Sequence, residues 1–193
     1  MPRLPFVEPL LELTAALERA GVPYAVGGAI AYGLHAEPRN TSDIDINIFV
    51  PESESGPVLD LMVGLGITVG PEQREEVLRR GQTRLNWGHL IVDPFFATVP
   101  FLDSAQQRRL KVEFEGQDLA ILSAEDLAVA KILFNRSKDW GDLANMVAIQ
   151  GDALDVGYIR SWLHEMLGDE DGRIDRFERL LAEVHRQVRE LEG

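Results

Sequence analysis

The sequence contains no cysteine, and lysine is almost as scarce, with three residues in a chain of 193. A chain without cysteine cannot form a disulfide, a thiolate zinc site, an iron–sulfur cluster or a thiol nucleophile. No apolar run approaches the roughly 18 residues that a membrane span requires, so we expect no membrane association. The residues that follow Met1 lack the apolar core of a signal peptide, and we therefore expect a cytoplasmic protein.

Positive charge is also in short supply, because 19 Lys and Arg stand against 32 Asp and Glu, a formal net charge of −13. Such a surface repels nucleic acids and anionic membranes in general. Any RNA contact would therefore depend on two local basic groups, Arg74–Arg84 and Arg108–Lys111. The remaining composition, 45% hydrophobic and 26% charged, is typical of a globular protein with one domain or one domain plus a small appendage.

The periodicity of the apolar residues changes near residue 122. Before that point, short strand patterns at 24–26, 43–50, 82–87, 89–96, 110–114 and 119–122 alternate with helical patterns at 6–20, 29–34, 53–64 and 72–80. After it, the pattern is helical throughout, at 124–134, 138–149, 155–167 and 173–191. The sequence therefore predicts an α/β domain over residues 1–122 and a helical region over residues 123–193.

Two acidic residues on one predicted strand form the first chemical signal. Asp43 and Asp45 alternate with isoleucines, so both carboxylates share one face, with Cβ atoms roughly 6–7 Å apart. Two anions so close repel each other unless a cation lies between them. Mg²⁺ is the natural partner, because it takes hard oxygen ligands and keeps coordination positions open for phosphate oxygens.

Gly27 and Gly28 form the second signal, since they lie between a predicted strand and a predicted helix. Glycines at such a turn allow the backbone to approach a phosphate closely, and the helix N-terminus offers N–H donors and the positive end of its dipole. The third signal is Asp93, an isolated acid in an apolar strand. If that strand neighbours the strand of Asp43, the three acids could hold two Mg²⁺ ions, and Asp93 could accept a proton from an attacking hydroxyl.

These features together resemble the nucleotidyltransferase superfamily, in which two glycines, a short helix, Arg-x-Thr-x-Asp-x-Asp and a later strand Asp recur. The more specific resemblance is to the AbiE-type (AbiEii-like) toxin nucleotidyltransferases of bacterial toxin–antitoxin systems. It rests on the segments VGGAIAYGLHAEPRNTSDIDI, LNWGHLIVDPFF and ILSAEDLAVAKILFNRSKDWGDLANM, and it covers about residues 20–150. The resemblance implies a nucleotidyltransferase fold, a mixed sheet flanked by helices, with the helical region packed against it.

The resemblance also implies a role for each matching residue. Asp43, Asp45 and Asp93 would be catalytic metal ligands, and Gly27 and Gly28 would hold the triphosphate of an NTP substrate. Arg39 and Thr41 are implied to line the nucleotide or acceptor side, and Lys131 is implied to reach the nucleotide phosphates. The residues implied to lie at the mouth of the cleft are Arg136, Lys138, Asp139 and Asp142. Many relatives carry a serine beside the glycine pair, whereas here Ala29 follows Gly28 and offers no hydroxyl to a phosphate.

By resemblance, the enzyme would transfer an NMP from an NTP to an RNA hydroxyl, at the tRNA 3′ end, and a cognate antitoxin protein would relieve the resulting growth inhibition. Two alternatives stay open. An acidic cleft also suits adenylylation of a small cationic antibiotic such as an aminoglycoside. The chain could instead be a nucleotidyltransferase-like binding or regulatory protein without catalysis, which the absence of the serine keeps open.

Overall fold

The computed structural model describes residues 4–192, with side chains up to residue 190. The sequence before Leu4, which bears on the signal-peptide prediction, lies outside this range. The chain divides into two compact units. The first contains the residues up to Ala31 together with Arg39–Leu122, and the second contains Tyr32–Pro38 and the chain from Ser123 onward.

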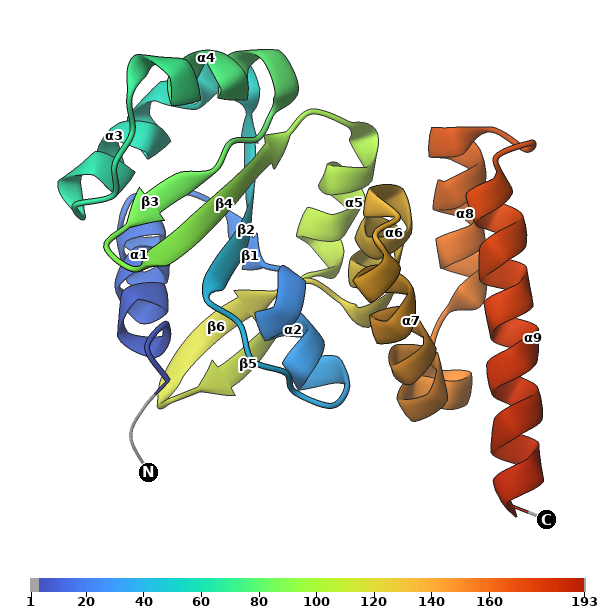
Figure 1. The fold of residues 1–193 in the computed structure, drawn as a ribbon. Helices are drawn as coiled ribbons and strands as arrows, with labels where there is room; N and C mark the ends of the chain where they lie inside the picture. The colour runs from blue at the N-terminus through green and yellow to red at the C-terminus, as the bar shows by residue number, and fades with distance from the viewer. Residues whose placement is uncertain (1–3, 193) are drawn as a thin grey trace. The chain divides into compact units, whose positions relative to one another are not determined.

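The first unit is built on one mixed sheet with the strand order β3-β4-β2-β1-β6-β5 (Figure 1). Its strands are β1 (Tyr24–Val26), β2 (Asp43–Pro51), β3 (Leu85–Trp87), β4 (Leu90–Ala97), β5 (Leu110–Phe114) and β6 (Gln117–Ile121). β2 runs parallel to β4, and β1 runs parallel to β6, while β1 and β2 are antiparallel. Ile44, Ile46 and Ile48 are fully buried, as their alternation with polar residues predicts.

The helices of the first unit are α1 (Val7–Arg19), the first turn of α2 (Gly28–His35), the 3₁₀ turn η1 (Glu52–Glu54), α3 (Gly56–Gly64), α4 (Pro71–Arg80) and α5 (Pro100–Arg108). α1 buries Leu10, Leu13 and Leu17 completely, and Gly21, with a φ of 68°, ends the turn that follows this helix. The helical spacing of these leucines thus produces the amphipathic helix that the sequence predicts.

The second unit consists, after the end of α2, of α6 (Ala124–Phe134), α7 (Ser137–Gln150), the 3₁₀ turn η2 (Gly151–Ala153), α8 (Val156–Leu167) and α9 (Gly172–Glu192). α8 and α9 run side by side in Figure 1. The Ser123 side chain accepts a hydrogen bond from the Asp126 backbone N–H at 3.1 Å, which confirms the predicted helix start. Four α-helices therefore follow residue 122 in the part of the chain that the structure describes, as their periodicity predicts.

Two predictions for the first unit need correction. The single helix predicted over 53–64 is interrupted, because η1 ends at Glu54 and α3 begins only at Gly56, with Pro57 in its first turn. The sequence patterns also do not predict α5. Its N-cap is Val99 in an extended conformation, and its first residue is Pro100, which favours a helix start. The helix is short and its apolar residues are only weakly periodic, so the hydrophobic pattern does not predict it.

No helix within residues 4–192 combines the length and the apolar character needed to cross a bilayer.

The contribution of α9 packing to the stability of the second unit can be tested at Phe177. Phe177 is completely buried, and replacing it with alanine removes a large apolar side chain from the space shared by α9 and its neighbours. We expect Phe177→Ala to lower the free energy of unfolding by about 3–5 kcal/mol, as urea titration monitored by circular dichroism would show. The exposed Gln187 on the same helix is the control, and Gln187→Ala should change stability by less than about 0.5 kcal/mol. Equal effects of the two substitutions would contradict this account of the packing.

Candidate active site

The parallel pairing of β2 and β4 brings the three predicted acids to one face of the sheet. Asp45 lies directly opposite Asp93, and Asp43 lies opposite Ile91, two positions along the same strands. Partners in register on neighbouring strands are about 5 Å apart, and side chains two residues apart on one strand share a face. All three acids are partly exposed, whereas the isoleucines between them are buried on the other side. The strand of Asp93 therefore neighbours that of Asp43, which is the condition for the three acids to lie together.

The two glycines lie against this acidic face. The Gly27 N–H donates to the Asp45 carbonyl at 2.9 Å, and a Cβ on Gly27 would lie 2.9 Å from Asn47 Nδ2. Gly28 has a φ of 55°, and a Cβ on it would overlap the Asp45 carboxylate, lying only 2.7 Å from Asp45 Cβ. The first turn of α2 thus starts directly beside Asp45, at a place that only glycine fits without strain.

Thr41 and Arg39 precede the acidic strand. The Thr41 hydroxyl accepts a hydrogen bond from the Asp43 N–H at 3.1 Å and lies 3.2 Å from the Asp43 carbonyl oxygen, to which it can donate. Ser42 Oγ donates to Asp43 Oδ1 at 3.1 Å. Arg39 is exposed in the loop that leads into this turn. Thr41 therefore positions the start of β2, and its contact with a nucleotide stays a prediction, as does that of Arg39.

Arg84 is the residue of this face that the sequence patterns do not assign to the site. Its Nε donates to Asp93 Oδ1 at 2.9 Å and its Nη2 donates to Asp93 Oδ2 at 2.6 Å, so the guanidinium and the carboxylate form a two-pronged pair. This pairing raises the pKa of Arg84 above its usual range, first through the hydrogen bonds and charge of Asp93, and further through the charges of Asp43 and Asp45. One guanidinium therefore lies in the field of all three carboxylates.

The register of the β3–β4 hairpin would predict the pairing of Arg84 with Asp93. The sequence predicts two strands joined at Gly88, and the structure pairs Leu85 with Val92 across that turn. Extending the register by one residue places Arg84 opposite Asp93. The charge pattern along the chain instead places Arg84 in a basic group that could contact RNA.

The chemistry of the donor set fits a divalent cation, because carboxylate oxygens are the hard ligands that Mg²⁺ prefers. Gly28, which has no side chain, leaves room for the Asp45 carboxylate itself. Within the part of the chain that the structure describes, however, no group of three or more His, Cys, Asp or Glu side chains is already arranged around one point to hold a metal ion. Both oxygens of Asp93 are directed to Arg84. The residues could hold a metal once Asp93 leaves Arg84.

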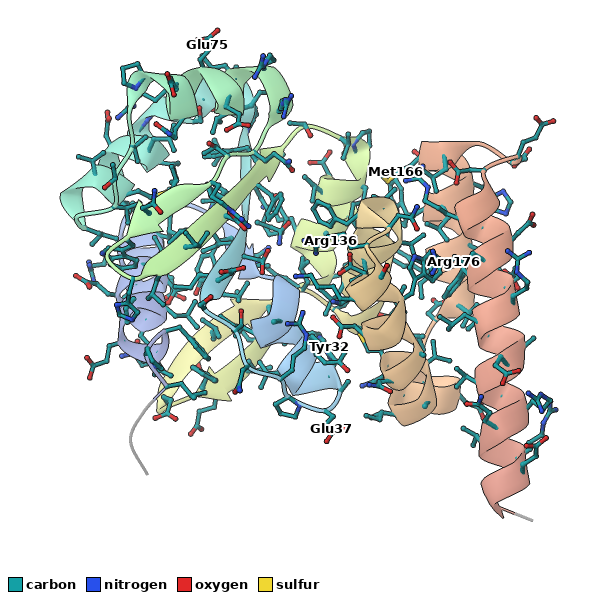
Figure 2. All side chains as sticks on the ribbon, viewed as in Figure 1. Tyr32, Glu37, Glu75, Arg136, Met166 and Arg176 are labelled. Atoms are coloured by element: carbon teal, nitrogen blue, oxygen red, sulfur yellow. The ribbon has the colours of Figure 1, made fainter. Side chains whose placement is uncertain are left out.

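The other predicted site residues belong to the second unit, where they form a buried ionic network of their own. Lys131, with a side chain only 5% exposed, donates to Asp142 Oδ2 at 2.6 Å and lies 3.9 Å from Asp139 Oδ1. Arg136, labelled in Figure 2, donates from Nε to Asp139 Oδ2 at 2.7 Å, and Asp139 is fully buried. Lys138 is exposed.

Asp142 and Asp139 compensate the charge of Lys131 within the helical unit, as a buried ammonium requires. Its Nζ also lies 5.2 Å from the centre of the Tyr32 ring. The family resemblance assigns Lys131 to the nucleotide phosphates, and that role stays a prediction, together with the roles of Arg136, Lys138 and Asp139.

Several arginines and lysines of the two predicted basic groups already pair with acids or with backbone carbonyls. Arg74 pairs with Asp60 at 2.6 Å, and Lys111 pairs with Asp118 at 3.1 Å. Arg109 donates to the Gln106 carbonyl. Glu75, labelled in Figure 2 on α4, adds a negative charge next to Arg74 in the chain. The positive charge that these groups offer to a polyanion is therefore smaller than the sequence suggests.

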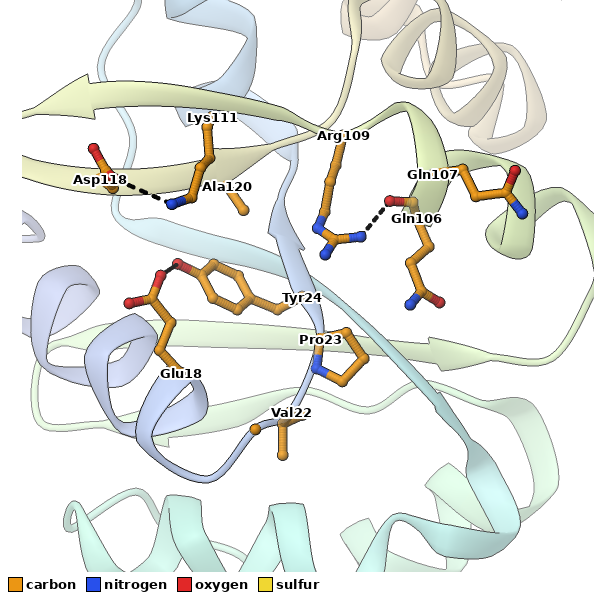
Figure 3. A pocket seen from close by; sticks show the side chains of 11 residues that line it. Glu18, Val22, Pro23, Tyr24, Gln106, Gln107, Arg109, Lys111, Asp118 and Ala120 are labelled. Atoms are coloured by element: carbon orange, nitrogen blue, oxygen red, sulfur yellow. Dashed lines mark hydrogen bonds and ion pairs between the residues drawn. The ribbon is translucent and has the colours of Figure 1, made fainter.

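A pocket of about 750 Å³ opens at the start of β1, between the end of α1 and the β5–β6 hairpin (Figure 3). Tyr24 lines it and donates its hydroxyl to Glu18 at 3.0 Å, and burial, followed by this acceptor, raises the pKa of Tyr24 to about 12. The acids of the site lie elsewhere, since Gly27 and Gly28 follow the opposite end of β1. None of the residues that the sequence assigns to catalysis lines this pocket.

Comparison with solved structures gives the fold. The antibiotic-resistance factor ANT(2'')-Ia superposes with a TM-score of 0.58 at 16% identity, covering 96% of this chain and 94% of that one. A Thermotoga maritima protein described as a nucleotidyltransferase superposes with a TM-score of 0.52 at 16% identity, covering 86% of this chain and 96% of its own. The fold is that of the nucleotidyltransferases.

The lincosamide antibiotic adenylyltransferase LnuA superposes with a TM-score of 0.50 at 15% identity, covering 74% of this chain and 96% of that one. No family model matches the sequence, and no curated protein matches it either. The predicted nucleotidyltransferase fold is confirmed, whereas the AbiE-type resemblance is a matter of sequence motifs alone.

The position of Gly28 can be tested with a matched pair of substitutions. Gly88 has a φ of 61° and no heavy atom within 4 Å of the place where a Cβ would lie, so Gly88→Ala should cost only the left-handed strain of about 1–2 kcal/mol. Gly28→Ala adds the overlap with the Asp45 carboxylate, and we expect it to cost at least about 1 kcal/mol more in urea unfolding. Equal losses would show that the turn does not lie against Asp45.

Proposed function

We propose that the protein is a divalent-metal-dependent nucleotidyltransferase, which transfers an NMP from an NTP to an acceptor hydroxyl and releases pyrophosphate. The observation that carries this proposal is the register of Asp45 and Asp93 on adjacent parallel strands, with Asp43 on the same face and Gly28 against Asp45. A structural role explains this arrangement poorly, because three neighbouring carboxylates on one face repel each other.

The residues present divide the work of this reaction. Asp43, Asp45 and Asp93 would hold Mg²⁺, as two ions if the family resemblance applies, and the metal supplies charge neutralisation for the phosphate oxygens. The turn at Gly27 and Gly28 would bring backbone N–H donors and the positive end of α2 to the triphosphate. Asp93 would accept the proton of the acceptor hydroxyl while the hydroxyl oxygen bonds to the α-phosphorus and the bond to pyrophosphate breaks.

A small cationic acceptor suits the charges of this chain best. The net charge of −13 attracts a polycation, and arginines expected to meet RNA, such as Arg74 and Arg84, are paired with acids. The solved structure of ANT(2'')-Ia with adenylyl-2''-tobramycin superposes with a TM-score of 0.58 and covers 94% of this chain and 97% of that one. The acceptor class proposed here is therefore an aminoglycoside-like antibiotic that carries several amino groups.

An RNA acceptor, specifically a tRNA 3′ end modified by the toxin of a toxin–antitoxin pair, is the second candidate. It is favoured by the segment VGGAIAYGLHAEPRNTSDIDI, which carries the AbiE-type resemblance. In this case an antitoxin protein would be the partner, and RNA binding would be weak, local and sensitive to salt.

The metal-binding role of Asp45 can be tested with labelled ATP, CTP, GTP and UTP in the presence of Mg²⁺, with aminoglycosides and tRNA offered as acceptors. We expect Asp45→Asn to lower transfer roughly 1,000-fold, because the amide retains the size of the side chain but not its charge. Asp60→Asn removes an exposed carboxylate from the same unit and should leave transfer unchanged. Transfer by Asp45→Asn at the wild-type rate would refute the mechanism.

The same assay separates the two acceptors. We expect the label to move from one NTP to an aminoglycoside, with chelation of Mg²⁺ abolishing the reaction. Label found on tRNA instead, together with growth arrest on expression, would replace the antibiotic by RNA as the acceptor. Nucleotide binding without transfer to either acceptor would favour the non-catalytic alternative.

A further inference from the structure

The pair formed by Arg84 and Asp93 differs from an ordinary surface ion pair in the burial of its acid and in its two-pronged geometry. Asp93 is 13% exposed at its side chain, while Arg84 is 63% exposed, so the guanidinium covers the acid from the solvent side. β3 and β4 are already joined by backbone pairing on either side of the hairpin turn. The two-pronged geometry on a partly buried acid makes this pair stronger than an ordinary surface ion pair, and it places the guanidinium on a carboxylate of the proposed metal site.

Arg84 brings a positive charge to the acidic face. Its hydrogen bonds reach Asp93, and the charges of Asp43 and Asp45 act on it as well. Arg74, another arginine before this hairpin, forms its ion pair with Asp60 and not with an acid of this face. In this structure the guanidinium of Arg84 therefore offsets the repulsion that the strand register creates.

A divalent cation on Asp93 and the guanidinium on Asp93 compete for the same position. The two-pronged pair engages both oxygens of the carboxylate. A cation bound to either oxygen would lie within a few ångströms of a fixed positive charge, in a partly buried place where such repulsion is strong. Metal binding at Asp93 therefore requires Arg84 to move away.

The side chain that leaves Asp93 has an alternative partner of suitable shape. A guanidinium binds phosphate through the same fork of two N–H donors that it uses for a carboxylate. Arg84 is exposed and lies at the β3 edge of the acidic face, so it can turn without disturbing the buried core. The phosphate chain of a nucleotide held at that face would be within reach of such a rotation.

We propose that Arg84 is an exchangeable counter-ion, which pairs with Asp93 in the metal-free protein and transfers to the phosphate chain of the nucleotide when a divalent cation occupies the carboxylates. The inference rests on the proposed function for the identity of the phosphate ligand. Arg84 then opposes metal binding alone and supports phosphate binding, so metal and nucleotide favour each other through one side chain.

This exchange predicts changes of opposite sign in one variant. Arg84→Gln should bind Mn²⁺ alone roughly fivefold more tightly than the wild type, because the competing charge is gone. The same variant should bind inorganic tripolyphosphate in saturating Mg²⁺ roughly tenfold more weakly, because one charge-assisted contact is lost. Both affinities are measured by isothermal titration calorimetry, with tripolyphosphate chosen because it presents the phosphate chain without a base.

Two further variants serve as controls. Arg84→Lys keeps the charge but not the fork, so both affinities should fall between those of the wild type and Arg84→Gln. Arg19→Gln removes an exposed arginine of α1 from the same unit, and both affinities should equal those of the wild type. If Arg19→Gln reproduces the changes, net charge alone accounts for them and the proposal is wrong.

The outcomes separate this inference from the proposed function. Mn²⁺ binding that is lost in Asp45→Asn but equal in the wild type and Arg84→Gln would leave the carboxylate site in place and overturn the role of Arg84. Tripolyphosphate affinity that is unchanged in Arg84→Gln would overturn it as well. Mn²⁺ binding that is absent from the wild type, or equally strong in Asp45→Asn, would overturn the proposed function itself.

Discussion

The repulsion among Asp43, Asp45 and Asp93 is the constraint on which the rest of the first unit depends. The parallel pairing of β2 and β4 puts Asp45 directly beside Asp93, and the alternation along β2 adds Asp43 to the same face. Such a face needs a positive charge to be stable, and the structure supplies Arg84 from the side of β3 and the first turn of α2 at Gly28. In the proposed reaction a metal would replace Arg84 at Asp93, and the turn at Gly28 would bind the triphosphate.

Sequence patterns predict the elements that carry a strong period or a strong cap. The isoleucine alternation of β2, the leucine spacing of α1 and the Ser123–Asp126 start of α6 are all local signals, and the structure contains each of these elements. The break between η1 and α3 and the presence of α5 escape prediction, because Gly56-Pro57 and Val99-Pro100 change the backbone within a residue or two. Local propensity alone resolves such boundaries poorly.

The candidate site is also predictable only in part, because local patterns along the chain do not show which side chains meet in space. The three acids and the glycine pair have a motif spacing that can be read along the chain, whereas ion pairing depends on register between strands. Arg84 and Lys131 illustrate the difference, since both are cations beside predicted acids. Arg84 meets Asp93 across a hairpin, and Lys131 meets Asp142 across two helices, so each is paired before any ligand arrives. The sequence assigns both cations to external phosphates without these partners.

The central claim is that the acidic face of β2 and β4 binds a divalent cation and thereby releases Arg84. The most direct measurement is a crystal structure with Mn²⁺ and tripolyphosphate, in which anomalous scattering locates the metal. The account predicts Mn²⁺ bound by oxygens of Asp43, Asp45 and Asp93, with the Arg84 guanidinium on the phosphate chain. Mn²⁺ bound at other residues, or Arg84 still paired with Asp93 beside a bound metal, would contradict it.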